Sequence, residues 1–313
     1  MPTSSSSTPP VPIGIAERDT GFSKDTLRIW ERRYGFPSPV RDPAGERAYP
    51  PDQIAKLRLI RRLVDEGRRP GQVVALSMPE LQLLIEDAPA PPSVVAPART
   101  ADRIDLAPYV DLLHRHDAKG LRGRLGDACV RWGLERFIVE LVAPLTTEIG
   151  DAWMRGRLAI YEEHLFSESL QVVLRAATAR LPEPGPDARP RVLLTTFVGE
   201  PHGLGLLMAQ GLLALDGVPC VSLGVETPVW DIAQAAAAFR SDVVALSFTG
   251  AMNPNAMVDG LKDLRGRLGP AVELWAGGGA PALHRRAVAG VVPLATLPQL
   301  HARVSRWRDA VRA

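Results

Sequence analysis

The stretch that decides the fold of the C-terminal part reads Val198-Gly199-Glu200-Pro201-His202-Gly203-Leu204-Gly205, and it follows the apolar run Val192 to Phe197. The run predicts a strand, the glycine-bearing stretch a tight loop, and residues 204–215 a helix. In open α/β sheets, ligands bind at such strand-to-helix loops. A carboxylate stands two residues before His202, and a metal-binding histidine needs such an acceptor for its other ring nitrogen. The alternative interpretation is an ordinary surface or capping histidine.

The composition is that of a globular chain with more than one domain. Its 313 residues are enough for two or three buried cores, with 46% hydrophobic and 23% charged residues. No run approaches the roughly 18 apolar residues that a membrane span needs, and no secretory leader is evident. We therefore expect a cytoplasmic protein without a membrane partner. Cys129 and Cys220 offer neither a disulfide framework nor a zinc quartet.

The N-terminal part has the pattern of a helix-turn-helix. Residues 1–11 are rich in Ser and Pro and are expected to be disordered. Residues 13–18 predict a short helix, 19–22 a turn, and Ser23 the N-cap of a second helix that ends near Arg33. A small hairpin, or wing, is expected over residues 40–49 with its turn at 42–45, and a further helix over 52–66.

Basic residues gather on these elements. Helical spacing places Lys24, Arg28 and Arg32 on one face. Residues 28–69 hold eleven Lys or Arg against six Asp or Glu. Arginines so placed can contact phosphates and make binding sensitive to salt. The alternative is a solvated helix face that binds nothing.

The sequence from Thr26 to Pro37 carries a family resemblance. The segment Trp30-Glu31-Arg32-Arg33-Tyr34-Gly35, followed by Arg41, Arg47 and Tyr49, resembles the MerR-type DNA-binding domain in its CarH/LitR form. The resemblance covers residues 13 to about 80 and implies a winged helix-turn-helix domain, over 12–85, that recognises operator DNA. The residues that it implies at the DNA are Lys24, Thr26, Arg28, Arg32, Arg33, Tyr34, Arg41, Arg47 and Tyr49.

The rest of the chain predicts two further domains. A Pro/Ala-rich linker occupies residues 86–101, and helical periodicity over 102–182, in segments near 104–117, 120–131, 134–152 and 158–181, predicts a four-helix bundle. After a second linker at 183–190, residues 191–313 alternate between strands and helices. Strands are expected near 191–198, 218–223, 242–248, 272–276 and 290–294, with a last helix over 297–311. The expected fold is multidomain, and its third part is a doubly wound, five-stranded parallel sheet.

Two more polar or glycine-rich groups follow strands of this sheet. Ser247-Phe248-Thr249 comes at the end of the third expected strand, and Gly277-Gly278-Gly279 at the end of the fourth. Parallel strands end at one edge, so both groups are expected beside His202. Glycines there would let a bulky ligand approach the backbone. A dinucleotide site is excluded because residues 199–205 lack Gly-x-Gly-x-x-Gly, and there is no P-loop.

This set resembles the cobalamin-binding domain of methionine synthase and the corrinoid mutases. The family pattern is Asp-x-His-x-x-Gly, then Ser-x-Leu, then Gly-Gly, with separations that match this chain; Glu200 replaces the Asp and Thr249 the Leu. The resemblance implies that His202 is the lower axial cobalt ligand. It also implies that the nucleotide tail passes Ser247 toward the glycines. The residues expected around the cofactor in this domain are Glu200, His202, Gly205, Ser247, Thr249, Gly277 and Gly278.

The bundle carries a third resemblance. Trp153, followed by Glu163 and His164, resembles the set that covers the adenosyl group in CarH/LitR photoreceptors. An indole can enclose that group, and a carboxylate can accept its hydrogen bonds. Met154 stands where some relatives have a histidine. On spacing alone, the alternative is a core aromatic residue and an exposed helix start.

Together these resemblances predict an adenosylcobalamin-dependent, light-responsive transcriptional repressor, not an enzyme, that assembles as a homotetramer in the dark. Two alternatives stay open. One is a cobalamin-binding MerR-type regulator that ignores light. The other is a corrinoid methyl-carrier for a methyltransferase, against which the N-terminal domain argues.

Overall fold

The computed structural model describes residues 9–42, 44–65, 68–86, 104–155, 157–250 and 252–312. The chain divides into two compact units, residues 1–92 with 154–157, and residues 93–153 with 158–313. The expected tail at 1–8 and most of the linker expected at 86–101 lie outside the described residues. Among the helices that these ranges cover, none has both the length and the apolar character of a membrane span.

The first unit is the expected winged helix-turn-helix. Ser23 caps the second helix, because its hydroxyl accepts the backbone N–H of Thr26 at 3.2 Å. Gly21 and Gly35 end the two helices in the left-handed conformation, at φ 69° each. The core includes Leu27, Trp30 and Ile60. The elements are α1 (Ile13–Thr20), α2 (Lys24–Tyr34), β2 (Val40–Arg41), β3 (Arg47–Tyr49) and α3 (Pro51–Asp65).

This unit differs from expectation at both ends. The expectation of a disordered tail through residue 11 is wrong at its end, because Val11 lies in strand β1 (Val11–Pro12) and pairs antiparallel with Tyr49. β3 therefore becomes the middle strand of a three-stranded sheet in the order β1-β3-β2. Two short helices, α4 (Pro70–Val73) and α5 (Met78–Glu86), complete the unit and were not predicted as elements.

The second unit begins with the expected helical bundle. The third of its four segments is not a continuous α-helix, because residues 137–142 form a π-helix in which Ala143 N–H bonds to Ile138 O. A π-turn holds one residue more than an α-turn and is not visible in apolar spacing. The elements are α6 (Ala107–His114), α7 (Ala118–Trp132), α8 (Leu134–Arg136), η1 (Phe137–Val142), α9 (Ala143–Met154) and α10 (Ile160–Thr178).

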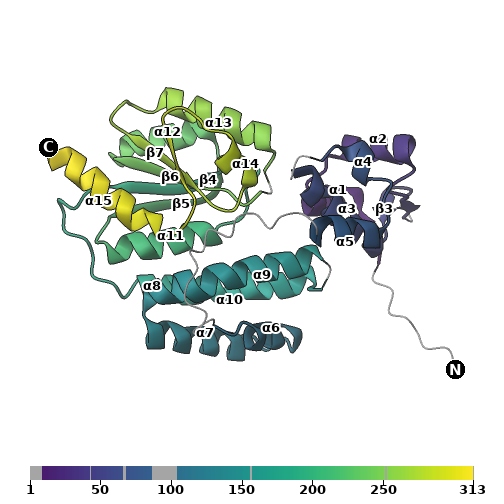
Figure 1. Ribbon diagram of the computed structural model, residues 1–313, viewed down its shortest axis with the longest axis horizontal. Helices are drawn as coiled ribbons and strands as arrows, with labels where there is room; N and C mark the ends of the chain where they lie inside the picture. The colour runs from purple at the N-terminus through teal and green to yellow at the C-terminus, as the bar shows by residue number, and fades with distance from the viewer. Residues whose placement is uncertain are drawn as a thin grey trace. The chain divides into compact units, whose positions relative to one another are not determined.

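The α/β part is the expected doubly wound sheet, with five parallel strands in the order β5-β4-β6-β7-β8. Figure 1 shows α12 and α13 on one face of the sheet and α11 and α15 on the other. The strands are β4 (Val192–Phe197), β5 (Cys220–Thr227), β6 (Val243–Ser247), β7 (Glu273–Gly277) and β8 (Val291–Leu294). The helices are α11 (Leu204–Leu215), α12 (Val229–Ala238), α13 (Pro254–Arg267), α14 (Pro281–Arg285) and α15 (Gln299–Arg312).

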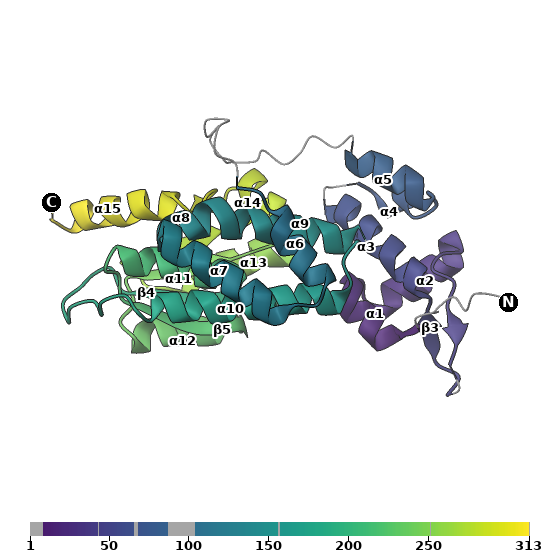
Figure 2. The same cartoon turned by 90° about the horizontal axis from the view of Figure 1, so that it is seen from below.

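Helix α11 joins the bundle to the sheet. It packs against α10, and Figure 2 gives a second view of the bundle helices and the sheet. Gly211 lets α11 also approach η1 closely, because a Cβ there would lie 2.8 Å from the Ile138 side chain. Apolar side chains from the bundle and from one face of the sheet form a single core. The bundle and the α/β part are therefore one packed body.

The strand order places a topological switch point between β4 and β6. β4 is followed by β5 on one side, and the chain returns to β6 on the other side. In doubly wound sheets the crevice at the carboxyl ends of such strands is where ligands bind. The two strands end at Phe197 and Ser247, so the loops at 198–203 and 248–250 border this crevice.

Candidate functional site

The loop after β4 is held by its own backbone and by a buried threonine. Gly199 takes φ +89°, a conformation that favours glycine, and Glu200 N–H donates to Phe197 O at 3.0 Å to close the turn. The Thr196 hydroxyl donates to Glu200 O at 2.6 Å. It also accepts the backbone N–H of Glu226, at 2.8 Å, from the neighbouring strand β5. The loop is thus fixed to two strands before its side chains are considered.

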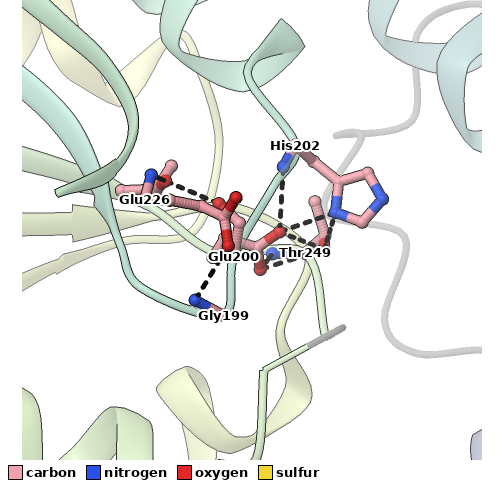
Figure 3. A network of polar contacts seen from close by, with 6 residues as sticks. Gly199, Glu200, His202, Glu226 and Thr249 are labelled. Carbon is pink, nitrogen blue, oxygen red and sulfur yellow. Dashed lines mark hydrogen bonds and ion pairs between the residues drawn. The ribbon is translucent and has the colours of Figure 1, made fainter. Parts of the chain in front are cut away.

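The Glu200 carboxylate is fully buried and is bound from two sides. His202 Nδ1 lies 2.7 Å from Oε1, and Thr249 N–H donates to Oε2 at 2.8 Å. The Thr249 hydroxyl lies 2.9 Å and 3.0 Å from the two oxygens. Figure 3 shows these contacts converging on the carboxylate. These hydrogen bonds offset the cost of burying the negative charge of the carboxylate.

The imidazole of His202 is oriented by this carboxylate. Nδ1 is the nitrogen that faces Glu200, and Figure 3 shows the other ring nitrogen on the far side of the ring. Half of the His202 side chain is exposed. A histidine whose Nδ1–H is held by a carboxylate presents Nε2 as a lone-pair donor, which is the arrangement that metal-binding histidines adopt.

The two groups shift each other's pKa. Burial lowers the pKa of His202, but the hydrogen bond and charge of Glu200, with a contribution from the charge of Glu163, outweigh it and raise the pKa. Burial raises the pKa of Glu200, but hydrogen bonds from His202 and Thr249 outweigh it and lower the pKa. The carboxylate is therefore ionised at neutral pH. The effect of Glu163 on His202 ties the bundle electrostatically to this loop.

Ser247 and Gly205 lie against each other at the switch point. Ser247 ends β6 and is 8% exposed, and a Cβ on Gly205 would lie 2.4 Å from the Ser247 hydroxyl oxygen. The first turn of α11 can approach β6 only because residue 205 has no side chain. The structure thus brings these two residues together, as expected, beside the His202 loop.

Gly277, the last residue of β7, and Gly278, which follows it, lie close to neighbouring backbone. Gly278 takes φ +109°, and a Cβ there would lie 2.1 Å from Phe248 O; a Cβ on Gly277 would lie 3.3 Å from Leu294 O. The space beside Gly278 is filled by the backbone of the loop after β6. The absence of a side chain at Gly278 lets this loop pass close by, and a role of Gly277 and Gly278 toward a ligand stays a prediction.

The bundle residues of the expected set lie on two helices. Trp153 is near the end of α9 and is partly buried against the common core. Glu163 is in the first turn of α10, where its Oε1 accepts the Ser167 hydroxyl at 2.6 Å and its Oε2 pairs with His164 Nδ1 at 2.9 Å. Glu163 is mostly buried, and His164 is largely exposed. Their roles toward a ligand remain predictions, and the side chain of Met154 lies outside the described parts.

Some residues of the site were not predicted. Glu226 accepts the backbone N–H of Gly199 at 3.3 Å, from a β5 that extends past the expected end at 223 to Thr227. Thr196 and the Thr249 hydroxyl were also missed as loop-holding groups. One signal was present in the sequence, since Thr195-Thr196 stands before the last residue of a strand that is otherwise apolar and buried. Buried hydroxyls need partners, and the loop supplies one here.

The expected DNA-binding residues of α2 present an exposed basic face. Lys24, Arg28, Arg32 and Arg33 are exposed. Lys24 lies 3.9 Å from Glu17, Arg28 lies 3.1 Å from Asp25, and Arg33 lies over the Tyr34 ring. Thr26 is engaged in the N-cap with Ser23, at 2.9 Å. These exposed pairs are weak and leave the cations available to phosphates.

Of the three wing residues expected at the DNA, two arginines lie near the surface and the tyrosine is buried. Arg41 is exposed and donates to Gly45 O at 2.7 Å, and Arg47 pairs with Glu31 of α2 at 2.9 Å. Tyr49, expected at the DNA, is 0% exposed and lies in the core. Its side chain belongs to the buried cluster that also holds Leu27 and Trp30. Tyr49 is a core residue of the domain.

Comparison with family models assigns three regions of the chain. Residues 11–76 match the MerR HTH family regulatory protein model. Residues 106–178 and 190–293 match two B12 binding domain models. The first region holds the basic face of α2, and the other two hold the bundle and the sheet with the His202 loop.

Two curated relatives match over most of the chain. The HTH-type transcriptional repressor CarH of Myxococcus xanthus is 31% identical over 274 residues, which is 87% of this chain and 90% of that protein. The HTH-type transcriptional repressor CarA of the same organism is 31% identical over 252 residues, 80% of this chain and 81% of that protein. Among solved structures, the monomethylamine corrinoid protein of Methanosarcina barkeri has a TM-score of 0.52 at 16% identity, over 64% of this chain and 96% of that one. That likeness concerns the fold.

Proposed function

Because the chain belongs to the family of HTH-type transcriptional repressors that includes CarH and CarA, we propose that it is a repressor controlled by adenosylcobalamin and by light. Transcription regulation, DNA binding and cobalamin binding come with the MerR HTH and B12 binding domains. The adenosyl form, the response to light and the change of assembly are the proposal.

The observation that carries the proposal is the orientation of His202. Its Nδ1 faces a buried carboxylate at 2.7 Å, which leaves Nε2 as a donor on a half-exposed ring. One imidazole is what a metal held in a macrocycle takes from a protein, as haem iron does. The residues present therefore fit cobalamin: His202 would bind the cobalt, and Ser247 and Gly205 would line the adjoining crevice.

The bundle residues have a separate task in this proposal. Adenosylcobalamin supplies a cobalt–carbon bond that light can break. Trp153 would cover the adenosyl group with its indole, and Glu163 would accept its hydrogen bonds. Glu163 Oε1 accepts one hydrogen bond, from the Ser167 hydroxyl, and Oε2 lies 2.9 Å from His164 Nδ1, so both oxygens keep lone pairs for a ligand. His164 orients Glu163 from the exposed side.

The packing of the bundle on the sheet offers a route to DNA binding. α10 carries Glu163, and it packs on α11, which begins beside His202. A ligand held by both elements favours one arrangement of them, and losing part of that ligand changes the preference. The resemblance to CarH/LitR photoreceptors implies a homotetramer in the dark. Several DNA-binding domains in one such assembly would raise its affinity for operator DNA by multivalency. Disassembly would then release the operator.

The test uses the full chain loaded with adenosylcobalamin in the dark. A pool of random DNA duplexes is enriched on this protein, and the enriched duplex becomes the probe. Size by light scattering and binding of the probe are then measured before and after green light. The proposal predicts a smaller particle and weaker binding after illumination. Unchanged size and unchanged binding would contradict it.

The same experiment separates the two alternatives. A regulator that ignores light would bind the probe only with cobalamin, equally in darkness and light. A methyl-carrier would enrich no DNA at all. Trp153→Ala is the matching variant: it should abolish the dark assembly of a light sensor that uses the indole, whereas Trp230→Ala, at an exposed tryptophan of α12, should not.

A further inference from the structure

A histidine of the C-terminal helix α15 lies between two carboxylates that belong to different parts of the second unit. His301 Nδ1 is 2.7 Å from Oδ2 of Asp216, the residue that caps the end of α11. His301 Nε2 is 3.4 Å from Oε1 of Glu135, in α8 of the bundle. We propose that these three residues, the His301 cluster, link the bundle to the α/β part in a way that depends on protonation of the imidazole.

The protonation state of the ring decides whether both contacts can form. Only the imidazolium carries an N–H on each nitrogen, so only the charged ring can donate to both carboxylates. A neutral ring protonated on Nδ1 would point the lone pair of Nε2 at Glu135, and the other tautomer would point the lone pair of Nδ1 at Asp216. Histidine side chains change their charge between about pH 5 and pH 8. The link is therefore complete in mild acid and loses one contact as the pH rises through this range.

Burial makes the neutral ring costly. The His301 side chain is 29% exposed, and its Nε2 atom is buried without a hydrogen-bond partner among the residues that the structure describes. A buried polar atom left unpaired destabilises the state in which it occurs. A proton on Nε2 removes this cost, because the nitrogen then faces Glu135 as an ion pair. Glu135 is itself exposed, so it can turn to water when the ring is neutral.

The charged groups around the ring leave the imidazolium as the cation of the cluster. In the described parts of the chain, the side chains of Asp216 and Glu135 form their ion pairs with this ring. Arg308, two turns further along α15, donates to the backbone oxygen of Asp216 at 3.0 Å. Arg136, next to Glu135, pairs with Glu140 at 2.7 Å. Two carboxylates would therefore face the ring without a counter-charge once it loses its proton.

The His301 cluster lies at the end of α11 opposite the His202 loop. α11 has 12 residues and begins directly after that loop, so about 18 Å of helix separates the two places. Both α8 and α15 pack against α11, and Figures 1 and 2 show them at the same end of the body. The bundle thus has an attachment that needs no ligand. This inference goes beyond the proposed function and does not depend on it.

Hydrogen exchange of the full chain, without added cobalamin, measures the link. Protection factors, which allow for the pH dependence of the exchange chemistry, are compared between about pH 5.5 and about pH 8. In peptides from residues 134–142 and 299–312 we expect protection to fall about fivefold as the pH rises, as the loss of one net hydrogen bond would produce. Peptides from β6 should keep their protection.

Two amide substitutions separate the contacts. The amide of Glu135→Gln can accept from Nε2–H or donate to its lone pair, so the fall with pH should disappear. His301→Asn places an amide N–H near the position of Nδ1, which keeps the contact to Asp216 but does not reach Glu135. Its protection should be low and independent of pH. His284→Asn, at an exposed histidine of α14, is the matched control and should keep the fall.

Constant protection in the unsubstituted chain would overturn the proposal. A fall with pH that persisted in both Glu135→Gln and His301→Asn would overturn it as well, because another group would then be responsible. A general loss of stability cannot imitate the expected result, since the readout is the dependence on pH. Glu135 is exposed, so Glu135→Gln preserves the test if His301→Asn does not fold.

Discussion

The basic face of α2 and the loop of His202 are built in opposite ways. On α2 the candidate residues follow one another at helical spacing, are exposed, and pair with carboxylates that are near in sequence, as Arg28 does with Asp25. In the loop, Glu200 is fully buried and is bound by Thr249, 49 residues away. The α2 face depends on one helix, and the loop depends on the whole sheet.

This difference concerns how much of each site a single substitution can change. An exposed cation, surrounded by water, contributes to DNA binding by itself. Its removal changes the contributions of neighbouring residues very little, because exposed charges interact weakly. A buried, hydrogen-bonded carboxylate depends on every group around it. Substitutions should therefore act one by one on α2 and together at the sheet edge.

The largest effect is expected from Gly278→Ala. Its Cβ would lie 2.1 Å from Phe248 O, at φ +109°. Strain and overpacking together should lower the free energy of unfolding by about 3 kcal/mol. Hydrogen exchange of peptides from β6 and β7 in the full chain measures it. Gly279→Ala is the control, because its nearest neighbour is 3.8 Å away and it should exchange like the unsubstituted chain. Equal exchange in both variants would contradict this prediction, because it would show that the backbone around Phe248 can move to accommodate a side chain at position 278.

A smaller effect is expected from Asp242, which pairs with Arg189 across 53 residues and accepts Arg191 N–H at 2.7 Å. Burial raises the pKa of Asp242, but these hydrogen bonds outweigh it and lower the pKa. The stability it contributes is present above pH about 4 and is lost as the pH falls through the folded pKa.

Asp242→Asn should therefore cost about 1–2 kcal/mol at pH 7 and progressively less in acid, measured by hydrogen exchange of β6 across pH. Asp25→Asn is the local counterpart, since its pair with Arg28 is exposed, and only a small stability change is expected, from the lost charge in the first turn of α2. If Asp25→Asn lowered the free energy of unfolding as much as Asp242→Asn, long-range and local ion pairs would not differ in their contribution to stability.

Ser23→Ala tests the local side of the comparison. The hydroxyl caps α2, and its loss should destabilise that helix by about 1 kcal/mol. Ser23→Asn, which keeps a capping acceptor, should restore most of it. Exchange of the 13–34 backbone reports the change, while β4 and β6 should be unaffected. Spread of the effect into the sheet would contradict the independence of the two regions.

The smallest effect is expected from Arg32→Ala. Arg32 is exposed, and no carboxylate in the described ranges pairs with it. Loss of one phosphate contact should lower the slope of log affinity against log salt by about 0.9 and leave folding unchanged. The enriched duplex serves as the probe. Arg122→Ala, at an exposed site of α7, is the control and should leave the slope as it is.

Sequence alone predicted most elements of the fold, because their signals are short-range. Ser23 as an N-cap, the α2 helix and residues 204–215 as a helix all follow from local spacing and capping, and the structure has them. The meeting of the loops after β4, β6 and β7 was also predicted, since parallel strands end at one edge.

What could not be predicted depends on contacts between distant residues. Tyr49 was expected at the DNA from the family resemblance, and only the packing of the whole domain shows that its side chain lies in the core. The Thr249 hydroxyl gained a role only when the longer Glu200 side chain was seen to reach it. Glu226 entered the site because β5 continues beyond the apolar run that suggested it.

The π-helical segment η1 has a consequence for Trp153, which lies 11 residues beyond its end at Val142. One additional residue in a helix turns everything after it by about 100° around the axis. Deleting one residue within 137–142 would restore an even α-helix and carry the indole to another side of α9. The direction in which Trp153 points from the axis of α9 therefore depends on the number of residues in the six-residue segment η1.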